Sequence, residues 1–169
     1  MTCLYLHGYN GSLSDEKLAL LQKQYSTVIA PKIDYDTDDI NAVIDAAIQN
    51  KSIDVFIGSS LGGYVAYYYS NFYSKACLLL NPAFASKRIK EIKFEIKEPE
   101  YYPQKLTYMV VGANDELINY QDTIESICLS EISDVDFLLR VHPTLKHQIP
   151  VAVFEKELKN FNTLRLSFK

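Results

Sequence analysis

The chain has 169 residues, of which 48% are hydrophobic and 22% charged, a composition typical of one globular domain with its own core. The formal net charge is −4 and no dense patch of Lys and Arg occurs, which argues against binding to nucleic acid. The sequence shows neither a basic, apolar leader nor a run of about 20 apolar residues, so we expect a cytoplasmic protein without a membrane span.

Six short apolar runs predict strands, at residues 2–6, 27–30, 53–57, 76–80, 106–111 and 135–141. Between them, apolar side chains recur at helical spacing and predict helices within 12–25, 36–47, 61–72 and 120–128, and a last helix from Pro150. Ser12 and Asp15 have the spacing of a capping box, and Asp36 or Thr37 can cap the second helix. This alternation predicts one α/β domain over residues 1–169, with a parallel sheet covered by helices on both faces.

Two segments do not follow this alternation. Residues 83–105 form a long connection that alternates apolar and charged residues like a half-exposed strand, at Ile92, Phe94 and Ile96. We expect this segment to be a small mobile lid outside the sheet, because long connections in compact domains are usually functional or mobile. A similar alternation near the C-terminus, which we assign to no element, is formed by Leu164, Leu166 and Phe168.

The three cysteines, Cys3, Cys77 and Cys128, are odd in number and too widely spaced for a disulfide framework or a Cys-x-x-Cys metal site. Cys3 and Cys77 lie inside apolar runs, where we expect small buried side chains rather than reactive thiols. We therefore expect no metal centre.

The sharpest chemical signal is Gly58-Ser59-Ser60-Leu61-Gly62, a G-x-S-x-G pattern that follows a predicted strand and opens a predicted helix. In this setting the pattern predicts a nucleophile elbow, in which Ser60 occupies a strained turn flanked by small residues. The N–H groups at the start of the helix then point at any oxyanion that forms there. The alternatives are a plain Gly-rich turn and a phosphate-binding loop, although no dinucleotide-binding G-x-G-x-x-G and no Walker lysine is present.

Together with Leu4-Tyr5-Leu6-His7-Gly8-Tyr9 at the end of the first strand, this elbow resembles the α/β-hydrolase superfamily, and more narrowly the small bacterial esterases of the YqiA/YcfP type. Asn81-Pro82 after the fourth strand is similar to the same family. The resemblance implies a minimal α/β-hydrolase fold with strand order 2-1-3-4-5-6. It also implies an oxyanion hole formed by the backbone N–H groups of Leu61 and Tyr9. We expect His7 to support this loop by hydrogen bonding; the alternative is a catalytic base.

In this fold the catalytic acid and base follow the serine in chain order. Asp115, just after the fifth strand, matches the family's G-x-x-D position, and Glu116 is the alternative acid. An Asp115 that merely caps the next helix would have no catalytic role. The expected base is His147, between the sixth strand and the last helix, and His142 at the strand end is the alternative. The candidates all follow the C-terminal ends of strands, where open α/β sheets gather their sites.

These residues predict a serine esterase that cleaves carboxylic esters through an acyl-enzyme, with no metal or organic cofactor. Its partner would be a small-molecule acyl ester. Two alternatives stay open: an acyl-CoA thioesterase, and a catalytically silent hydrolase-like protein that binds a ligand or a partner. The sequence does not predict the acyl length of the substrate or the oligomeric state.

Overall fold

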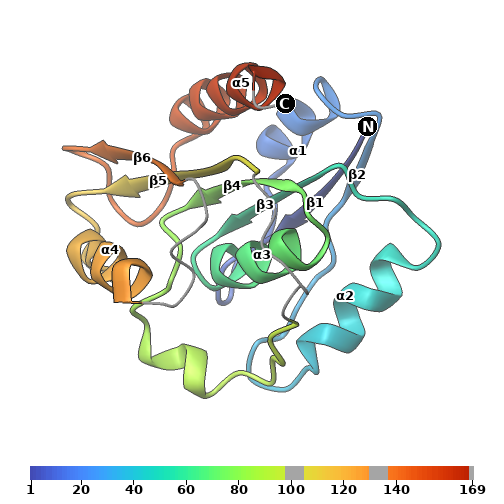
Figure 1. The fold of residues 1–169 in the computed structure, drawn as a ribbon, viewed down its shortest axis with the longest axis horizontal. Helices are drawn as coiled ribbons and strands as arrows, with labels where there is room; N and C mark the ends of the chain where they lie inside the picture. The colour runs from blue at the N-terminus through green and yellow to red at the C-terminus, as the bar shows by residue number, and fades with distance from the viewer. Residues whose placement is uncertain (98–104, 130–136, 168–169) are drawn as a thin grey trace.

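The structure is a computed structural model that describes residues 1–97, 105–129 and 137–167. Its centre is one six-stranded sheet in the order β2-β1-β3-β4-β5-β6, in which every neighbouring pair is parallel (Figure 1). The strands are β1 (Thr2–Leu6), β2 (Thr27–Ile29), β3 (Val55–Ser59), β4 (Ala76–Leu80), β5 (Thr107–Gly112) and β6 (Phe137–His142). The predicted parallel sheet and its strand order are confirmed.

The described residues also form five α-helices and one short 3₁₀ helix, η1, of which all but the last helix connect strands: α1 (Asp15–Gln22), α2 (Ile40–Ile48), α3 (Leu61–Phe72), η1 (Lys87–Lys90), α4 (Tyr120–Leu129) and α5 (Val151–Ser167). Helices α1 and α5 cover one face of the sheet, and α2, α3 and α4 lie on the other (Figure 1). Right-handed crossovers between parallel strands require helices on the faces, which explains this layered arrangement.

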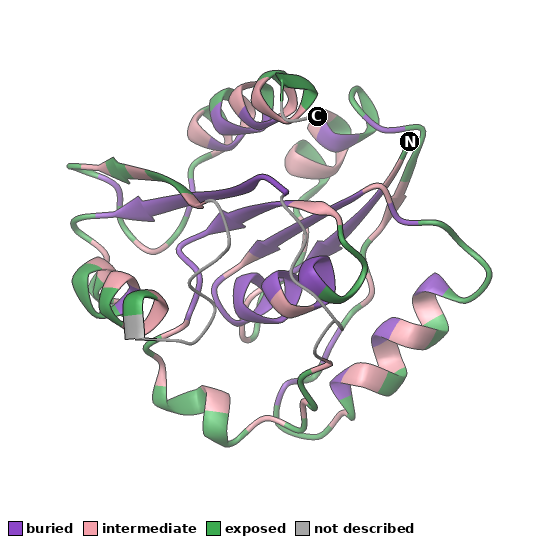
Figure 2. Ribbon diagram, in the orientation of Figure 1, coloured by how far each residue is buried: buried purple, intermediate pink, exposed green. Residues whose placement is uncertain are grey.

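The core consists of two apolar clusters, one on each side of the sheet. Phe56 belongs to the cluster under α2 and α3, whereas its neighbours Val55 and Ile57 belong to the cluster under α1 and α5. Successive residues of a strand point to opposite faces, so a strand covered on both faces is apolar at every position. Figure 2 shows this burial along β1, β3, β4 and β5. Cys3 and Cys77 are fully buried, as expected, and Cys128 is exposed.

The bounds of β1 and β4 are the predicted ones, and those of the other four strands differ by one or two residues. Strand β3 continues beyond Ile57, because Gly58 and Ser59 still pair with Leu79 and Leu80 of β4. Apolarity could not reveal this, since the two added residues are small or polar. The predicted start of β6, at Val135, lies outside the described residues.

Both predicted helix caps were wrong. Helix α1 is capped by Ser14, not Ser12: the Ser14 hydroxyl accepts the Lys17 N–H at 3.4 Å. Helix α2 is capped by Asp39, which accepts the Ala42 N–H at 3.0 Å, and not by Asp36 or Thr37. The preceding residues 34–38 are held in a turn by their own carboxylates, which delays the helix.

The described part of the 83–105 segment, up to residue 97, contributes no strand to the sheet. Ile92 and Phe94 pack against the core, and Lys93 forms an isolated parallel bridge with Asp39. Asn41 of α2 holds Glu95 through both backbone groups, at 2.8 and 3.0 Å. This part of the segment is therefore fastened to α2. Residues 98–104 lie outside the described residues.

Helix α5 includes most of the C-terminal alternation that the sequence left unassigned. Leu164 packs against the core, and Leu166 is exposed. Phe168 lies outside the described residues. Among the helices that the structure describes, none combines the length and apolarity needed to cross a membrane.

Candidate active site

Ser60 occupies a strained turn between the end of β3 and the start of α3. Its backbone angles are φ 54° and ψ −123°, a conformation that residues with a Cβ atom rarely adopt. Such strain costs about 1–3 kcal/mol and persists only where the surroundings enforce it. Here the Ser60 N–H donates to the Leu80 carbonyl at 3.0 Å, and the Ser60 carbonyl accepts the Ala83 N–H at 3.0 Å. The backbone of β4 and of the turn after it thus holds the elbow.

The glycines of the elbow are required by close backbone contacts. A Cβ atom on Gly62 would lie 2.2 Å from the Leu6 carbonyl oxygen, and one on Gly58 would lie 2.2 Å from the Gly62 oxygen. Neither contact can be relieved by moving a flexible side chain, because the obstructing atoms belong to the backbone. The small residues of G-x-S-x-G therefore allow α3 to begin directly against β1 and β3.

Asp115 and His147 come together although 32 residues separate them. Asp115 follows β5, His147 follows β6, and the Asp115 Oδ2 lies 2.8 Å from the His147 Nδ1. A carboxylate can only accept, so Nδ1 carries a proton, and in the neutral form of the imidazole the free lone pair is on Nε2. The Asp115 side chain is 1% exposed and the His147 side chain 22% exposed. The imidazole thus faces the accessible side of the pair.

The surroundings of Asp115 favour its charged form. Burial raises the pKa of the carboxyl, but the hydrogen bonds from His147 and from the Ile118 and Leu117 N–H groups outweigh burial and hold the pKa below its usual value. Asp115 is not the cap of the next helix, since α4 begins at Tyr120 after Asn119. Glu116, the alternative acid, points into solvent with a side chain 82% exposed.

Asn81, at the end of β4, positions the loop that carries His147. Its side-chain amide donates to the carbonyls of Lys146 and His147, both at 2.9 Å, and its Oδ1 accepts the Gly112 N–H at 2.8 Å. The residue is buried and has a φ of 43°. In the sequence Asn81-Pro82 is only a family likeness. The signal that could have identified Asn81 is an Asn that directly follows an apolar strand and precedes Pro.

His7 supports the loop after β1, as expected. Its Nε2 accepts the Ile33 N–H at 2.9 Å, so the proton is on Nδ1, which donates to the Gly8 carbonyl at 2.7 Å. Both ring nitrogens are therefore engaged by backbone. The Tyr35 hydroxyl also donates to the His7 carbonyl at 2.6 Å.

Two backbone donors lie beside Ser60. Leu61 is the first residue of α3, so its N–H has no partner within the helix. The Tyr9 N–H donates to no other group in the part of the chain that the structure describes. The loop of Tyr9 approaches the elbow closely, because a Cβ on Gly8 would lie only 2.9 Å from the Ser60 Cβ. Both N–H groups are available to an oxygen bound between them.

A cavity of about 670 Å³ brings most of these groups together. Ser60, Leu61, Tyr9 and His147 line it, with Asp115 behind the imidazole. Most of the remaining lining residues come from the loop after β1, helix α1, η1 and the loops after β5 and β6, and they include Lys17, Lys87, Arg88, Leu117, Ile118 and Ile149. The cavity opens at the C-terminal ends of the strands, where parallel sheets form their sites.

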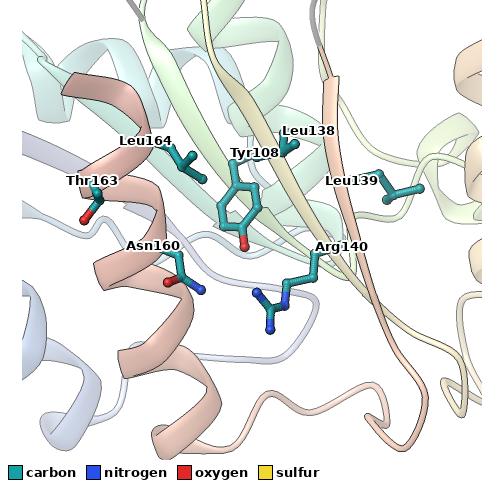
Figure 3. A pocket seen from close by; sticks show the side chains of 7 residues that line it. All are labelled: Tyr108, Leu138, Leu139, Arg140, Asn160, Thr163 and Leu164. Atoms are coloured by element: carbon teal, nitrogen blue, oxygen red, sulfur yellow. The ribbon is translucent and has the colours of Figure 1, made fainter. Parts of the chain in front are cut away.

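His142 is placed elsewhere. Its Nε2 lies 3.0 Å from Glu157 of α5, and it does not line the cavity that contains Ser60. A separate cavity of about 430 Å³ lies beside Glu157, and Figure 3 shows the polar ends of Tyr108, Arg140 and Asn160 converging at it between α5 and β6. Within the described residues, no three His, Cys, Asp or Glu side chains are grouped to hold a metal ion.

Residues 2–112 match the model of one protein family, described as Uncharacterised protein family (UPF0227). No curated protein matches the sequence. Among solved structures, SOBER1 from Arabidopsis thaliana is similar with a TM-score of 0.70 and 16% identity, over 98% of this chain and 99% of that one. A Bacillus cereus carboxylesterase has a TM-score of 0.60 and 18% identity, over 96% and 87% of the two chains.

A third similar structure is Est1E from Butyrivibrio proteoclasticus with bound ferulic acid, with a TM-score of 0.66 and 18% identity, over 98% of this chain and 89% of that one. At these identities the likeness shows the fold, which is that of the α/β hydrolases. The family model covers β1 to β5, and so includes the loop of Tyr9, the elbow of Ser60 and Asn81. The chain therefore belongs to the family UPF0227, of the YqiA/YcfP type, and has the α/β-hydrolase fold.

Proposed function

We propose that this protein is a serine esterase that cleaves small carboxylic esters through an acyl-enzyme, with Ser60, His147 and Asp115 as its catalytic triad. The observation that carries the proposal is one cavity lined by a strained serine and by a histidine whose Nδ1 is bound to a buried carboxylate. A serine hydroxyl is a weak nucleophile and needs an adjacent base, and the base needs a fixed tautomer. Similar structures include a carboxylesterase and an esterase, which favours the same chemistry.

In the proposed reaction the His147 Nε2 takes the Ser60 proton as the Ser60 oxygen attacks the acyl carbonyl carbon. The Leu61 and Tyr9 N–H groups donate to the oxyanion of the tetrahedral intermediate. Its collapse leaves the acyl group on Ser60, and His147 returns the proton to the departing alcohol. Water then attacks the acyl-enzyme while His147 accepts its proton. The second tetrahedral intermediate collapses as His147 returns the proton to the Ser60 oxygen, which breaks the bond between Ser60 and the acyl group and releases the acid. Asp115 stabilises the imidazole whenever it is cationic. The proposed reaction uses no metal or organic cofactor.

Ser60→Ala tests this mechanism. We expect kcat for p-nitrophenyl butyrate to fall about 10⁴-fold or more, with an unchanged circular dichroism spectrum. The reason is that Ser60 is the residue at the strained position of the elbow, and no neighbouring side chain can replace its hydroxyl there. Ser59→Ala is the matched control and should be far milder. A fluorophosphonate probe should label the wild type at Ser60. A folded Ser60→Ala variant with full activity would sink the mechanism, and an unlabelled, inactive wild type would favour a silent binding protein.

Substrate class and lid function are further parts of the proposal. Acyl-CoA thioesters are the alternative substrates, and comparing kcat/KM for acyl-CoA with that for short p-nitrophenyl esters distinguishes the two.

Residues 86–88 of the 83–105 segment line the cavity, which supports a lid role for that part, whereas Ile92 and Phe94 pack on the core. We expect the enzyme to act in the cytoplasm.

A further inference from the structure

Three basic side chains line the cavity of Ser60: Lys17 from α1, and Lys87 and Arg88 from η1. Among the described residues, no carboxylate lines it. The chain as a whole has a formal net charge of −4, so this cluster does not follow from composition. Charge of one sign in a cleft focuses the field and attracts ligands of the opposite sign.

The charge of Arg88 is already compensated. Its guanidinium lies 3.4 Å from Asp36 and 3.9 Å from Glu91, and it stacks 3.8 Å from the centre of the Tyr9 ring. Tyr9 in turn donates its hydroxyl to Asp36 at 2.7 Å. Arg88 is thus occupied in holding the Tyr9 loop, and an anion in the cavity has to be bound by the two lysines.

In the described part of the chain, neither lysine has an ion-pair partner. Within the described residues, the ammonium groups of Lys17 and Lys87 form no ion pair within 4.0 Å. Lys17 is half-buried, with its Nζ 5.6 Å from the centre of the Phe154 ring. Burial lowers the pKa of Lys17, and the nearby Glu16 acts in the opposite direction. Lys17, whose charge is partly removed from water and unpaired, therefore gains more from an incoming anion than the exposed Lys87 does.

We propose, building on the esterase function above, that the cavity selects esters that carry a second, anionic oxygen group such as a carboxylate, which Lys17 and Lys87 bind. The anionic group belongs to the acyl part or to the alcohol part of the ester. Both sources share one chemistry, and the attraction is electrostatic, so it weakens as salt screens the charges.

Two matched substrate pairs test the inference. For the acyl side, mono-p-nitrophenyl glutarate is compared with p-nitrophenyl butyrate; for the alcohol side, p-acetoxybenzoate is compared with p-acetoxybenzamide. Each kcat/KM is divided by the rate constant of the same ester with hydroxide, which removes differences in intrinsic reactivity. We expect at least one anionic ester to be preferred about tenfold at low salt, and the preference to shrink at high salt. The pair that shows it identifies the end of the ester.

The double variant Lys17→Gln with Lys87→Gln should reduce this preference to near one. Lys156→Gln, an exposed lysine on α5, is the matched control and should keep it. Equal normalised kcat/KM within both pairs, or a preference that survives in the double variant, would overturn the anion inference while the esterase stands. If the wild type hydrolyses none of the four esters, the esterase proposal itself would be overturned.

Discussion

The protein contains two histidine–carboxylate pairs that look alike in composition and differ in surroundings. His147 binds Asp115 through Nδ1 at 2.8 Å, and His142 binds Glu157 through Nε2 at 3.0 Å. Both carboxylates are almost fully buried, so burial does not distinguish the pairs. The difference is in the second partners: His147 lines the cavity of Ser60, whereas Glu157 is also bound by Tyr108, Arg140 and Asn160.

This difference teaches how one chemical pair serves two purposes. The Glu157 network joins β5 and β6 to α5, and its donors occupy the carboxylate, so the pair stabilises packing. Asp115 is bound on one oxygen by backbone and on the other by the His147 imidazole, which in the proposed mechanism accepts the Ser60 proton at Nε2. We therefore expect mutations in the first pair to alter stability and mutations in the second to alter rate.

The largest effect should separate the two histidines. We expect His147→Gln to lower kcat about 10⁴-fold or more, because the serine loses its base, with little change in Tm. His142→Gln should change kcat less than about threefold. It should lower the free energy of unfolding by about 1 kcal/mol, because a hydrogen bond is lost. Ester hydrolysis and thermal unfolding measured on both variants check this. An inactive, folded His142→Gln variant would reverse the assignment of the base.

Asp115→Asn should lower kcat about 10³- to 10⁴-fold, because the amide does not stabilise the cationic imidazole. It should also alter the pH dependence of stability. Since the pKa of Asp115 lies below its usual 3.8 in the folded protein, the carboxylate stabilises the fold above about pH 4 and loses this contribution as pH falls through the folded pKa. Urea unfolding of both proteins at neutral and acidic pH measures it; a constant difference would contradict the expectation.

Glu157→Gln should mainly lower stability, by about 2–4 kcal/mol at neutral pH, because it breaks a buried charged network. Burial raises the pKa of Glu157, but bonds from Tyr108, Asn160 and His142 and the charge of Arg140 hold it below its usual 4.5. The contribution is therefore present above about pH 4.5 and lost at lower pH. Urea unfolding gives the loss, and a kcat reduced more than stability explains would show that the network also serves catalysis.

The smallest effect compares the two arginines. Arg88→Ala should lower kcat roughly threefold to tenfold, because the Tyr9 ring loses the guanidinium stacked on it and its N–H is less firmly placed for the oxyanion. Arg140→Ala should lower Tm and leave kcat unchanged within about twofold, since Arg140 contacts Glu157 and not the cavity of Ser60. Equal kcat in the two variants would show that Arg88 does not position the Tyr9 loop for catalysis.

Much of the fold and part of the site could be predicted from the sequence. The parallel sheet follows from the apolar strands and its strand order from a family resemblance, and the elbow of Ser60 lies within one short stretch of chain. The choice of His147 over His142 followed from its position in a loop rather than at a strand end. The helix caps failed because several Ser and Asp residues compete locally, and only the fold decides between Ser12 and Ser14.

Contacts between distant segments could not be predicted. Arg88 and Asp36 are 52 residues apart, and nothing in their spacing indicates a shared role beside Tyr9. Glu157 is one of several charged residues in α5, and its burial depends on β5 and β6 lying beneath that helix. Ile92 and Phe94 alternated as in a strand, but they pack on the core because Asn41 of α2 binds the neighbouring Glu95 backbone.

The hydrogen bonds of Asn81 determine when the site can exist during folding. The backbone hydrogen bonds that hold the elbow reach only to Leu80 and Ala83, but Asn81 reaches partners 31, 65 and 66 residues further on, at Gly112, Lys146 and His147. Closing such long loops is slow, and the last partners belong to the loop after β6. If Ser60 and His147 act as proposed, we expect a chain emerging from synthesis to carry its serine before its base is in place, and to gain hydrolytic activity only once β6 has joined the sheet.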